Sequence, residues 1–167
     1  MTACAWGAIV WRLAGDPALP AVLLFAALAT VLALVDMAEH RLPNRVMAPC
    51  AGAIALLLVA AAQASGEWSA LLWAVIGGVG TFAMFLLVAV LSPPAMGMGD
   101  VKLAGVIGLV LAWFGFEAWL TGLVGGFVLG ALVAVLALTR GDVRLGDAIP
   151  FGPSMLAGAL TAILVWA

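Results

Sequence analysis

A short polar stretch, Gly97-Met98-Gly99-Asp100-Val101-Lys102, interrupts a chain that is otherwise almost wholly apolar. Two prolines precede it, and proline ends a helix because it lacks the N–H donor and clashes with the preceding turn. Its two glycines allow tight bending and the close approach of another chain. Asp100 then stands at the start of a hydrophobic run, where an ionisable group is expensive and favours a functional role. The alternative is that Asp100 only caps a helix.

A second carboxylate, Asp36, follows an earlier apolar run. If two helices bring both carboxylates within a few ångströms, the pair holds one shared proton, because both cannot ionise cheaply. The ionised member can take a proton from water as the water attacks an amide carbonyl, and the protonated member can assist the leaving nitrogen. Asp36 and Asp100 are therefore the candidate catalytic pair, without an assignment of which one is the base. Asp142 and Asp147 are alternative members of such a pair, although they fall in a loop.

The composition indicates a polytopic membrane protein, since 67% of the 167 residues are hydrophobic and 8% are charged. Apolar runs near twenty residues recur, each long enough to cross a hydrocarbon core of about 30 Å. We predict an all-α protein with about six transmembrane helices, a possible short helix before them, and a single membrane-embedded domain over residues 1–167. No basic patch favours nucleic-acid binding. The single histidine, His40, and two distant cysteines predict no metal site, and no cofactor is expected.

The expected spans alternate in direction, so the loops at 36–45, 92–102 and 139–149 share one side of the membrane. Five of the six Lys and Arg residues lie in these loops, which makes that side cytoplasmic by the positive-inside rule. Six of the seven tryptophans fall near the opposite ends, as an interfacial belt requires. The spans are expected at 18–35, 46–62, 71–91, 103–116, 118–138 and 150–167, after a short apolar segment at 3–13.

Glycines at helical spacing predict where helices approach one another closely. Gly122, Gly126 and Gly130 recur every four residues, a pattern that permits close helix contact in lipid. We expect this face to pack inside the molecule, with dimerisation as the alternative. The glycines at 77, 78 and 80 are expected to serve the same end.

Three motifs follow one another along the chain: Asp36-x6-Pro43-Asn44, Gly97-Met98-Gly99-Asp100-Val101-Lys102-Leu103 and Ile149-Pro150-Phe151-Gly152-Pro153. In order and spacing they resemble the motifs of the type IV prepilin peptidases, integral-membrane aspartyl proteases of the Gly-x-Gly-Asp type. The resemblance covers about residue 10 to the C-terminus. It implies that Asp36 and Asp100 are the catalytic aspartates. It also implies a prepilin or pseudopilin substrate, cut on the cytoplasmic side just before its hydrophobic N-terminal helix, and a role in type IV pilus assembly and protein secretion.

Residues beside the two aspartates are the candidate active-site loop, where the substrate's extended leader approaches. Glycine gives a substrate backbone room, and the cation two residues after Asp100 can bias that carboxylate or bind lipid headgroups. These candidates are Gly97, Gly99, Lys102, Pro43 and Asn44.

Larger members of that family carry an N-terminal cytoplasmic region, often with paired Cys-x-x-Cys zinc motifs, associated with methylating the new N-terminus. Nothing of this kind precedes the first apolar segment, so we expect a short form with peptidase activity and no methyl transfer, in the bacterial inner membrane. Presenilin and signal peptide peptidase share Gly-x-Gly-Asp but match less well, since their first aspartate typically follows Tyr, where this chain has Val35. A catalytically silent assembly factor or transporter-like scaffold is the alternative function. The oligomeric state is left open.

Overall fold

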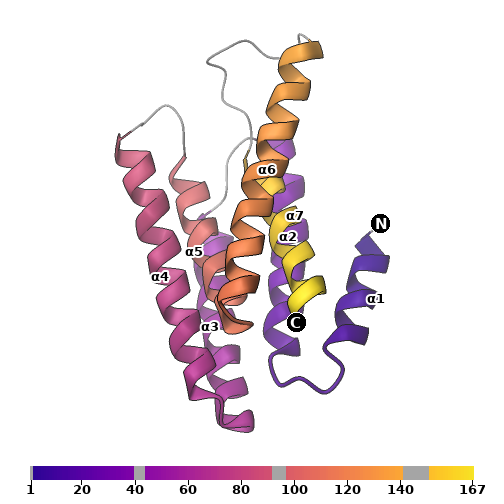
Figure 1. Cartoon of the computed structure of the whole chain (residues 1–167), viewed down its shortest axis with the longest axis vertical. Coiled ribbons are helices and arrows are strands. Elements are labelled where there is room, and N and C mark those ends of the chain that lie inside the picture. Colours follow the sequence, from indigo (N-terminus) through magenta and orange to yellow (C-terminus); the bar gives the residue numbers. More distant parts are fainter. Residues whose placement is uncertain (1, 40–43, 92–96, 141–150) are drawn as a thin grey trace.

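The computed structural model describes residues 2–39, 44–91, 97–140 and 151–167, and this part of the chain contains seven helices and no strand. Successive helices run in alternating directions along the long axis of the molecule (Figure 1). The prediction of an all-α protein with a short helix before the longer ones is confirmed. The helices are α1 (Thr2–Arg12), α2 (Leu19–Glu39), α3 (Asn44–Ser65), α4 (Trp68–Leu91), α5 (Met98–Trp113), α6 (Phe116–Arg140) and α7 (Gly152–Trp166).

At the end of the bundle that carries Asp36 and Asp100, the helices extend further than the apolar runs predicted. α2 continues to Glu39, so Asp36 lies within the helix, and α5 begins at Met98, so Asp100 and Lys102 are helical. The expected loop over 92–102 is therefore wrong from residue 98 onward. The reason is local: Gly97 is extended, with φ −77° and ψ 150°, and a carboxylate in the first turn is favoured by the positive end of the helix dipole.

The apolar run expected to end at residue 116 instead breaks at Gly115. This glycine has φ +107°, a left-handed conformation that favours a residue without a Cβ. The N–H groups of Phe114 and Gly115 bond back to Leu111 and Ala112, which ends α5, and Phe116 starts α6. Phe116 therefore belongs to the following helix.

The outer faces of the helices suit a bilayer. Within the described residues, three segments are long and apolar enough to cross a membrane: Met47–Ser65, Trp68–Leu91 and Phe116–Arg140. Large apolar side chains on these segments point outward, among them Leu56, Leu87 and Val128. The protein is a helical integral membrane protein.

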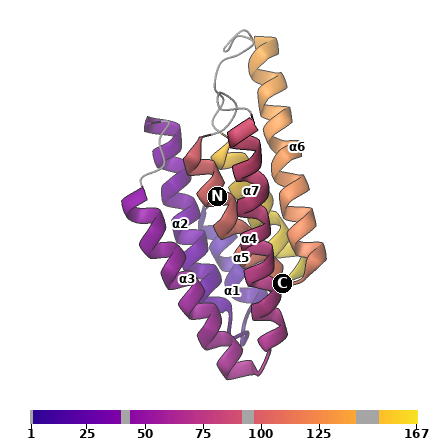
Figure 2. The ribbon, with the colours of Figure 1, turned by 90° about the vertical axis from the view of Figure 1, so that its left-hand side faces the viewer.

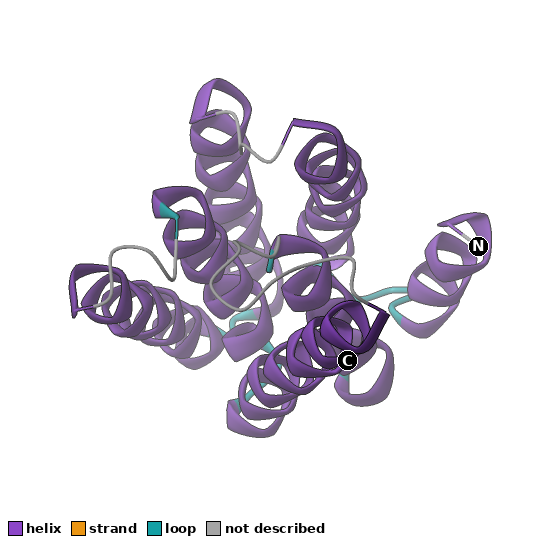
Figure 3. Cartoon of the chain, turned by 90° about the horizontal axis from the view of Figure 1, so that it is seen from above, coloured by secondary structure: helices purple, strands orange, loops and turns teal. Residues whose placement is uncertain are grey.

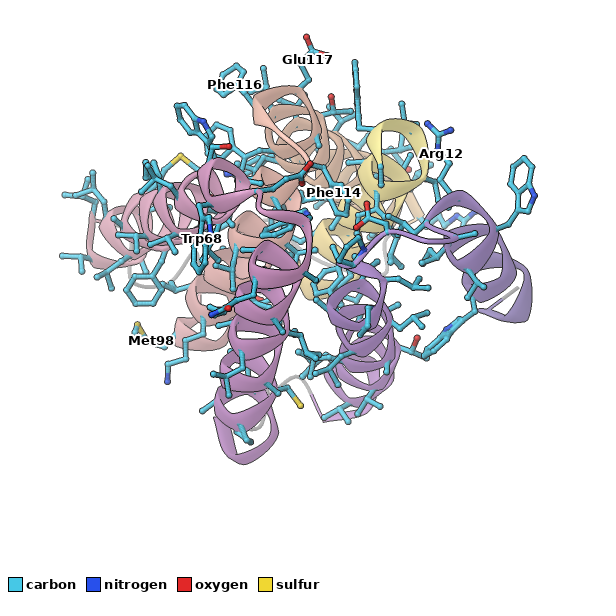
Figure 4. The ribbon with its side chains drawn as sticks, turned by 90° about the horizontal axis from the view of Figure 1, so that it is seen from below. Arg12, Trp68, Met98, Phe114, Phe116 and Glu117 are labelled. Carbon is cyan, nitrogen blue, oxygen red and sulfur yellow. The ribbon has the colours of Figure 1, made fainter. Side chains whose placement is uncertain are left out.

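The end of the bundle opposite the candidate site holds most of the tryptophans. Trp68 begins α4 and Trp113 ends α5. Figure 4 shows this end of the bundle, with Trp68, Phe114 and Phe116 labelled. Arg12 also lies here, where its Nη2 donates a 3.3 Å hydrogen bond to the Val165 carbonyl oxygen. This bond joins α1, which lies at the edge of the bundle (Figure 3), to α7.

Glycines form the tight contact between α6 and α7. A Cβ built at Gly158 would lie 2.7 Å from the Gly122 carbonyl oxygen and 2.8 Å from the Gly126 Cα, so the two backbones touch. Gly130 packs against the ring of Phe151 in the same interface. The prediction that Gly122, Gly126 and Gly130 pack inside the molecule is confirmed.

A second tight contact joins α4 and α5. A Cβ at Gly78 would lie 3.1 Å from the Leu109 Cβ and 3.2 Å from the Gly105 carbonyl oxygen. Gly77 faces Ala112 and Gly108 in the same way, as predicted. The expectation for Gly80 was wrong, because nothing lies within 4 Å of its Cβ position. An α-helix has 3.6 residues per turn, so the glycines at 77, 78 and 80 point in different directions and cannot all lie on one face.

Candidate active site

The first turn of α5 holds Asp100 in a fixed position. The Asp100 N–H donates to the Gly97 carbonyl oxygen at 3.1 Å, and the Val101 N–H donates to the same oxygen at 3.3 Å. Val101, Leu103 and Ala104 are fully buried around it, whereas Asp100 is half-buried. The turn is thus anchored by its apolar residues, and the carboxylate lies at the edge of the core.

Gly97 lies next to this carboxylate. Its φ of −77° is open to any residue, so the backbone does not require glycine here. A Cβ at Gly97 would instead lie 4.0 Å from Asp100 Oδ2. Gly97 is exposed and occupies the N-cap position, so Asp100 itself is not the cap of α5. Asp100 instead lies in the first turn, where the helix dipole favours its charge, so a purely structural role for this carboxylate stays open as the alternative.

Asp36 lies in the last turns of α2, and its side chain is outside the part that the structure describes. α2 and α5 contact each other and run in opposite directions, so the last turns of α2 and the first turn of α5 lie at the same end of the bundle (Figures 1 and 2). Of the candidates Asp142, Asp147 and His40, none falls within the described residues.

The other motif residues also gather at this end. Asn44 is the first residue of α3, and Phe151 precedes α7 at its N-cap position. Pro43 lies outside the described residues. Gly99 and Lys102 are half-buried residues of α5, which corrects their assignment to a loop. Both lie within one turn of Asp100.

Sequence reasoning missed a groove beside this end. A pocket of about 520 Å³ lies between α3, α4 and α5, and Lys102 is one of its lining residues. The groove depends on how three helices are placed, which no single motif reports. Small residues at 48, 51, 78 and 105 were the signal available in the sequence.

The comparison with known families bears on these same residues. The model described as "Type IV leader peptidase family" matches residues 23–135, which is more than half of the chain and includes Asp36 and Asp100. The chain belongs to the type IV leader peptidase family. The family predicted from the three motifs is thereby confirmed.

The curated relatives that this chain matches are longer proteins. The chain is 26% identical over 164 residues to a prepilin leader peptidase/N-methyltransferase of Bacillus subtilis, covering 98% of this chain and 63% of the relative. It is 31% identical over 138 residues to the protein of the same name in Pseudomonas putida, covering 80% of this chain and 45% of the relative. The chain therefore spans about half the length of these relatives. No solved structure matches it.

Proposed function

We propose that this chain is an aspartyl endopeptidase that removes the N-terminal leader of type IV prepilins or pseudopilins at the cytoplasmic face of the bacterial inner membrane. The observation that carries the proposal is the placement of Asp36 and Asp100. They lie at the same end of two contacting antiparallel helices, and both fall within the segment matched by the family model. The names of the relatives supply the prepilin as substrate.

In the proposed mechanism the two carboxylates share one proton when the substrate is bound. The ionised carboxylate takes a proton from a water molecule as its oxygen attacks the scissile carbonyl carbon. The protonated carboxylate gives its proton to the leaving nitrogen, so the C–N bond breaks and the pair is returned to a singly protonated state. The anchored first turn of α5 fixes Asp100 for this step, and pre-set geometry is a large part of what catalysis requires.

Gly97 and Gly99 serve substrate approach in this proposal. An extended backbone would reach the carboxylate past Gly97, whose Cβ position lies 4.0 Å from Asp100 Oδ2. Lys102, two residues further along the same helix, adds a positive charge at this end of the bundle. Pro43 and Asn44 belong to the segment that joins α2 to α3 and are assigned to the same approach.

A scaffold without catalysis is the competing function, and a cleavage assay separates the two. The full chain is reconstituted in vesicles of phosphatidylethanolamine and phosphatidylglycerol with a prepilin, and the product is identified by mass spectrometry of its new N-terminus. The proposal requires cleavage directly before the apolar helix. An intact substrate that still binds the protein would identify a scaffold. With a methyl donor added to the vesicles, the same spectra test the prediction that the new N-terminus stays unmethylated.

A further inference from the structure

The groove between α3, α4 and α5 is open and apolar. α3 and α4 meet where Gly66 and Glu67 connect them and diverge toward the other end, with α5 behind them (Figure 2). Exposed valines stand on its α4 side, with Val79 63% exposed. The described residues that line it are Met47, Ala48, Ala51, Val75, Gly78, Val79, Phe82, Lys102, Gly105, Val106 and Leu109.

The groove leads away from the candidate active site. Its lining on α5 includes Lys102, Val106 and Leu109, which follow one another at helical spacing along one face. These residues span about 10 Å along the axis at 1.5 Å per residue. The first of them, Lys102, is two residues beyond Asp100, about 3 Å further along the axis and on the opposite side of α5. One end of the groove is therefore level with the carboxylate, and the other lies deeper along the bundle.

The residues that line the groove are typical of a surface that packs against a helix rather than of a water-filled site. Among the described lining residues, Lys102 carries a charge and the rest are apolar. Ala48, Ala51 and Gly105 are small, and small residues let helix backbones approach closely where lipid gives no hydrophobic drive. A partner in this groove must be apolar along its length and polar where it meets Lys102.

We propose that this groove holds the apolar helix that follows the scissile bond of the substrate. The inference rests on the proposed function, which requires such a helix beside the two aspartates. A helix seated between α3 and α4 would begin at the level of Lys102. The extended segment before it would then pass the start of α5 at Gly97 to reach Asp100.

Photo-crosslinking tests the position of the helix without requiring cleavage. Benzoylphenylalanine is placed at Val79 in the groove or, as a control, at Val128 on α6, which is 60% exposed and outside the groove lining. Each full-length protein is irradiated with a prepilin in the same phospholipid vesicles. We expect crosslinks from position 79 to the apolar helix of the substrate and none from position 128. Crosslinks to lipid alone at position 79, or equal crosslinks from both positions, would overturn the proposal.

Steric block of the groove gives a second measurement. Val79→Trp should raise the KM for prepilin about tenfold or more, a binding loss of about 1.4 kcal/mol, while Val128→Trp leaves it unchanged. Thermal unfolding of both variants in detergent checks that each is folded. An unchanged KM in folded Val79→Trp contradicts the proposal. If the unmodified protein fails to cleave prepilin, the proposed function is wrong, and the crosslinks still decide whether the groove binds the helix.

Discussion

The indole Nε1 of Trp119 donates a 2.8 Å hydrogen bond to Thr81 Oγ1, linking α6 to α4. The same hydroxyl donates to the Gly77 carbonyl oxygen at 2.6 Å, so the fully buried threonine acts as both acceptor and donor. Gly108 of α5 packs directly on it, since a Cβ there would lie 2.8 Å from the Thr81 Cβ. Three helices therefore meet at one side chain, and one of them carries Asp100.

Removing this hydroxyl should destabilise the protein modestly. Thr81→Val leaves the half-buried indole N–H of Trp119 without this acceptor, and interhelical hydrogen bonds in membranes are worth about 0.5–1.5 kcal/mol. Thr81→Ser keeps the hydroxyl and is the matched control. The measurement is unfolding in mixed micelles with increasing dodecyl sulfate, combined with Trp119→Phe in a double-mutant cycle. Additive effects of Thr81→Val and Trp119→Phe would show that the bond contributes nothing.

The contact between α6 and α7 predicts a sharp difference between two neighbouring glycines. Gly158→Ala places a methyl group against the backbone of Gly122 and Gly126, which cannot move aside without separating the helices. We expect a loss of about 1–3 kcal/mol, as for other overpacked interiors. Gly125→Ala is the control, because its Cβ position is an ordinary 3.7 Å from the Gly158 Cα. Equal unfolding midpoints for the two variants would contradict this packing.

Composition and motifs were enough to predict the helical membrane fold and the family, and the physical reasons can be given for particular residues. Apolar runs near twenty residues must be helices in a bilayer, since backbone polar groups there need partners. The spacing of Gly122, Gly126 and Gly130 predicted the α6 face that packs inside the molecule, and the Gly-x-Gly-Asp motif predicted the family. Hydropathy placed Lys102 in a loop, however, because charge lowers hydropathy without preventing helix formation.

The groove and the Thr81 hydrogen bonds could not be predicted in the same way. Both depend on which residues of separate helices come together. Trp119 lies 38 positions from Thr81 in the chain, and neither residue belongs to a motif. The lining of the groove comes from three helices whose separation is set by their packing elsewhere. Local patterns report the face of one helix, not its distance from another.

The turn between α5 and α6 should require glycine only because of the backbone conformation at this position. Gly115 has φ +107° and nothing within 4 Å of its Cβ position, so Gly115→Ala costs backbone strain of about 1 kcal/mol without any clash. Gly52→Ala is the matched control, since Gly52 is helical with equally open surroundings and alanine favours a helix. We expect a lower unfolding midpoint for Gly115→Ala and an equal or higher one for Gly52→Ala. The reverse order would contradict the left-handed turn.

Narrowing the space beside Asp100 should reduce activity while leaving the fold intact. Gly97→Val adds a branched side chain next to Asp100 Oδ2, at a position whose backbone accepts any residue. We expect kcat/KM for prepilin cleavage to fall about tenfold, or about 1.4 kcal/mol of transition-state stabilisation, while the unfolding midpoint falls only slightly because valine is a poorer N-cap residue than glycine. Gly80→Val serves as the control, because Gly80 is exposed and open on α4. Full activity in Gly97→Val would show that this space is not used.

Cleavage of a prepilin by single aspartate variants tests the central claim most directly. Asp36→Asn and Asp100→Asn are compared in vesicles with Asp16→Asn, a control at the opposite end of the bundle, where Asp16 Oδ1 accepts a 2.7 Å hydrogen bond from the Ala18 N–H and asparagine can do the same. Because each catalytic carboxylate must carry or accept a proton, either substitution should lower the cleavage rate by about 10²–10⁴, while Asp16→Asn cleaves normally. Normal cleavage by folded Asp36→Asn or Asp100→Asn would contradict the assignment of the catalytic pair.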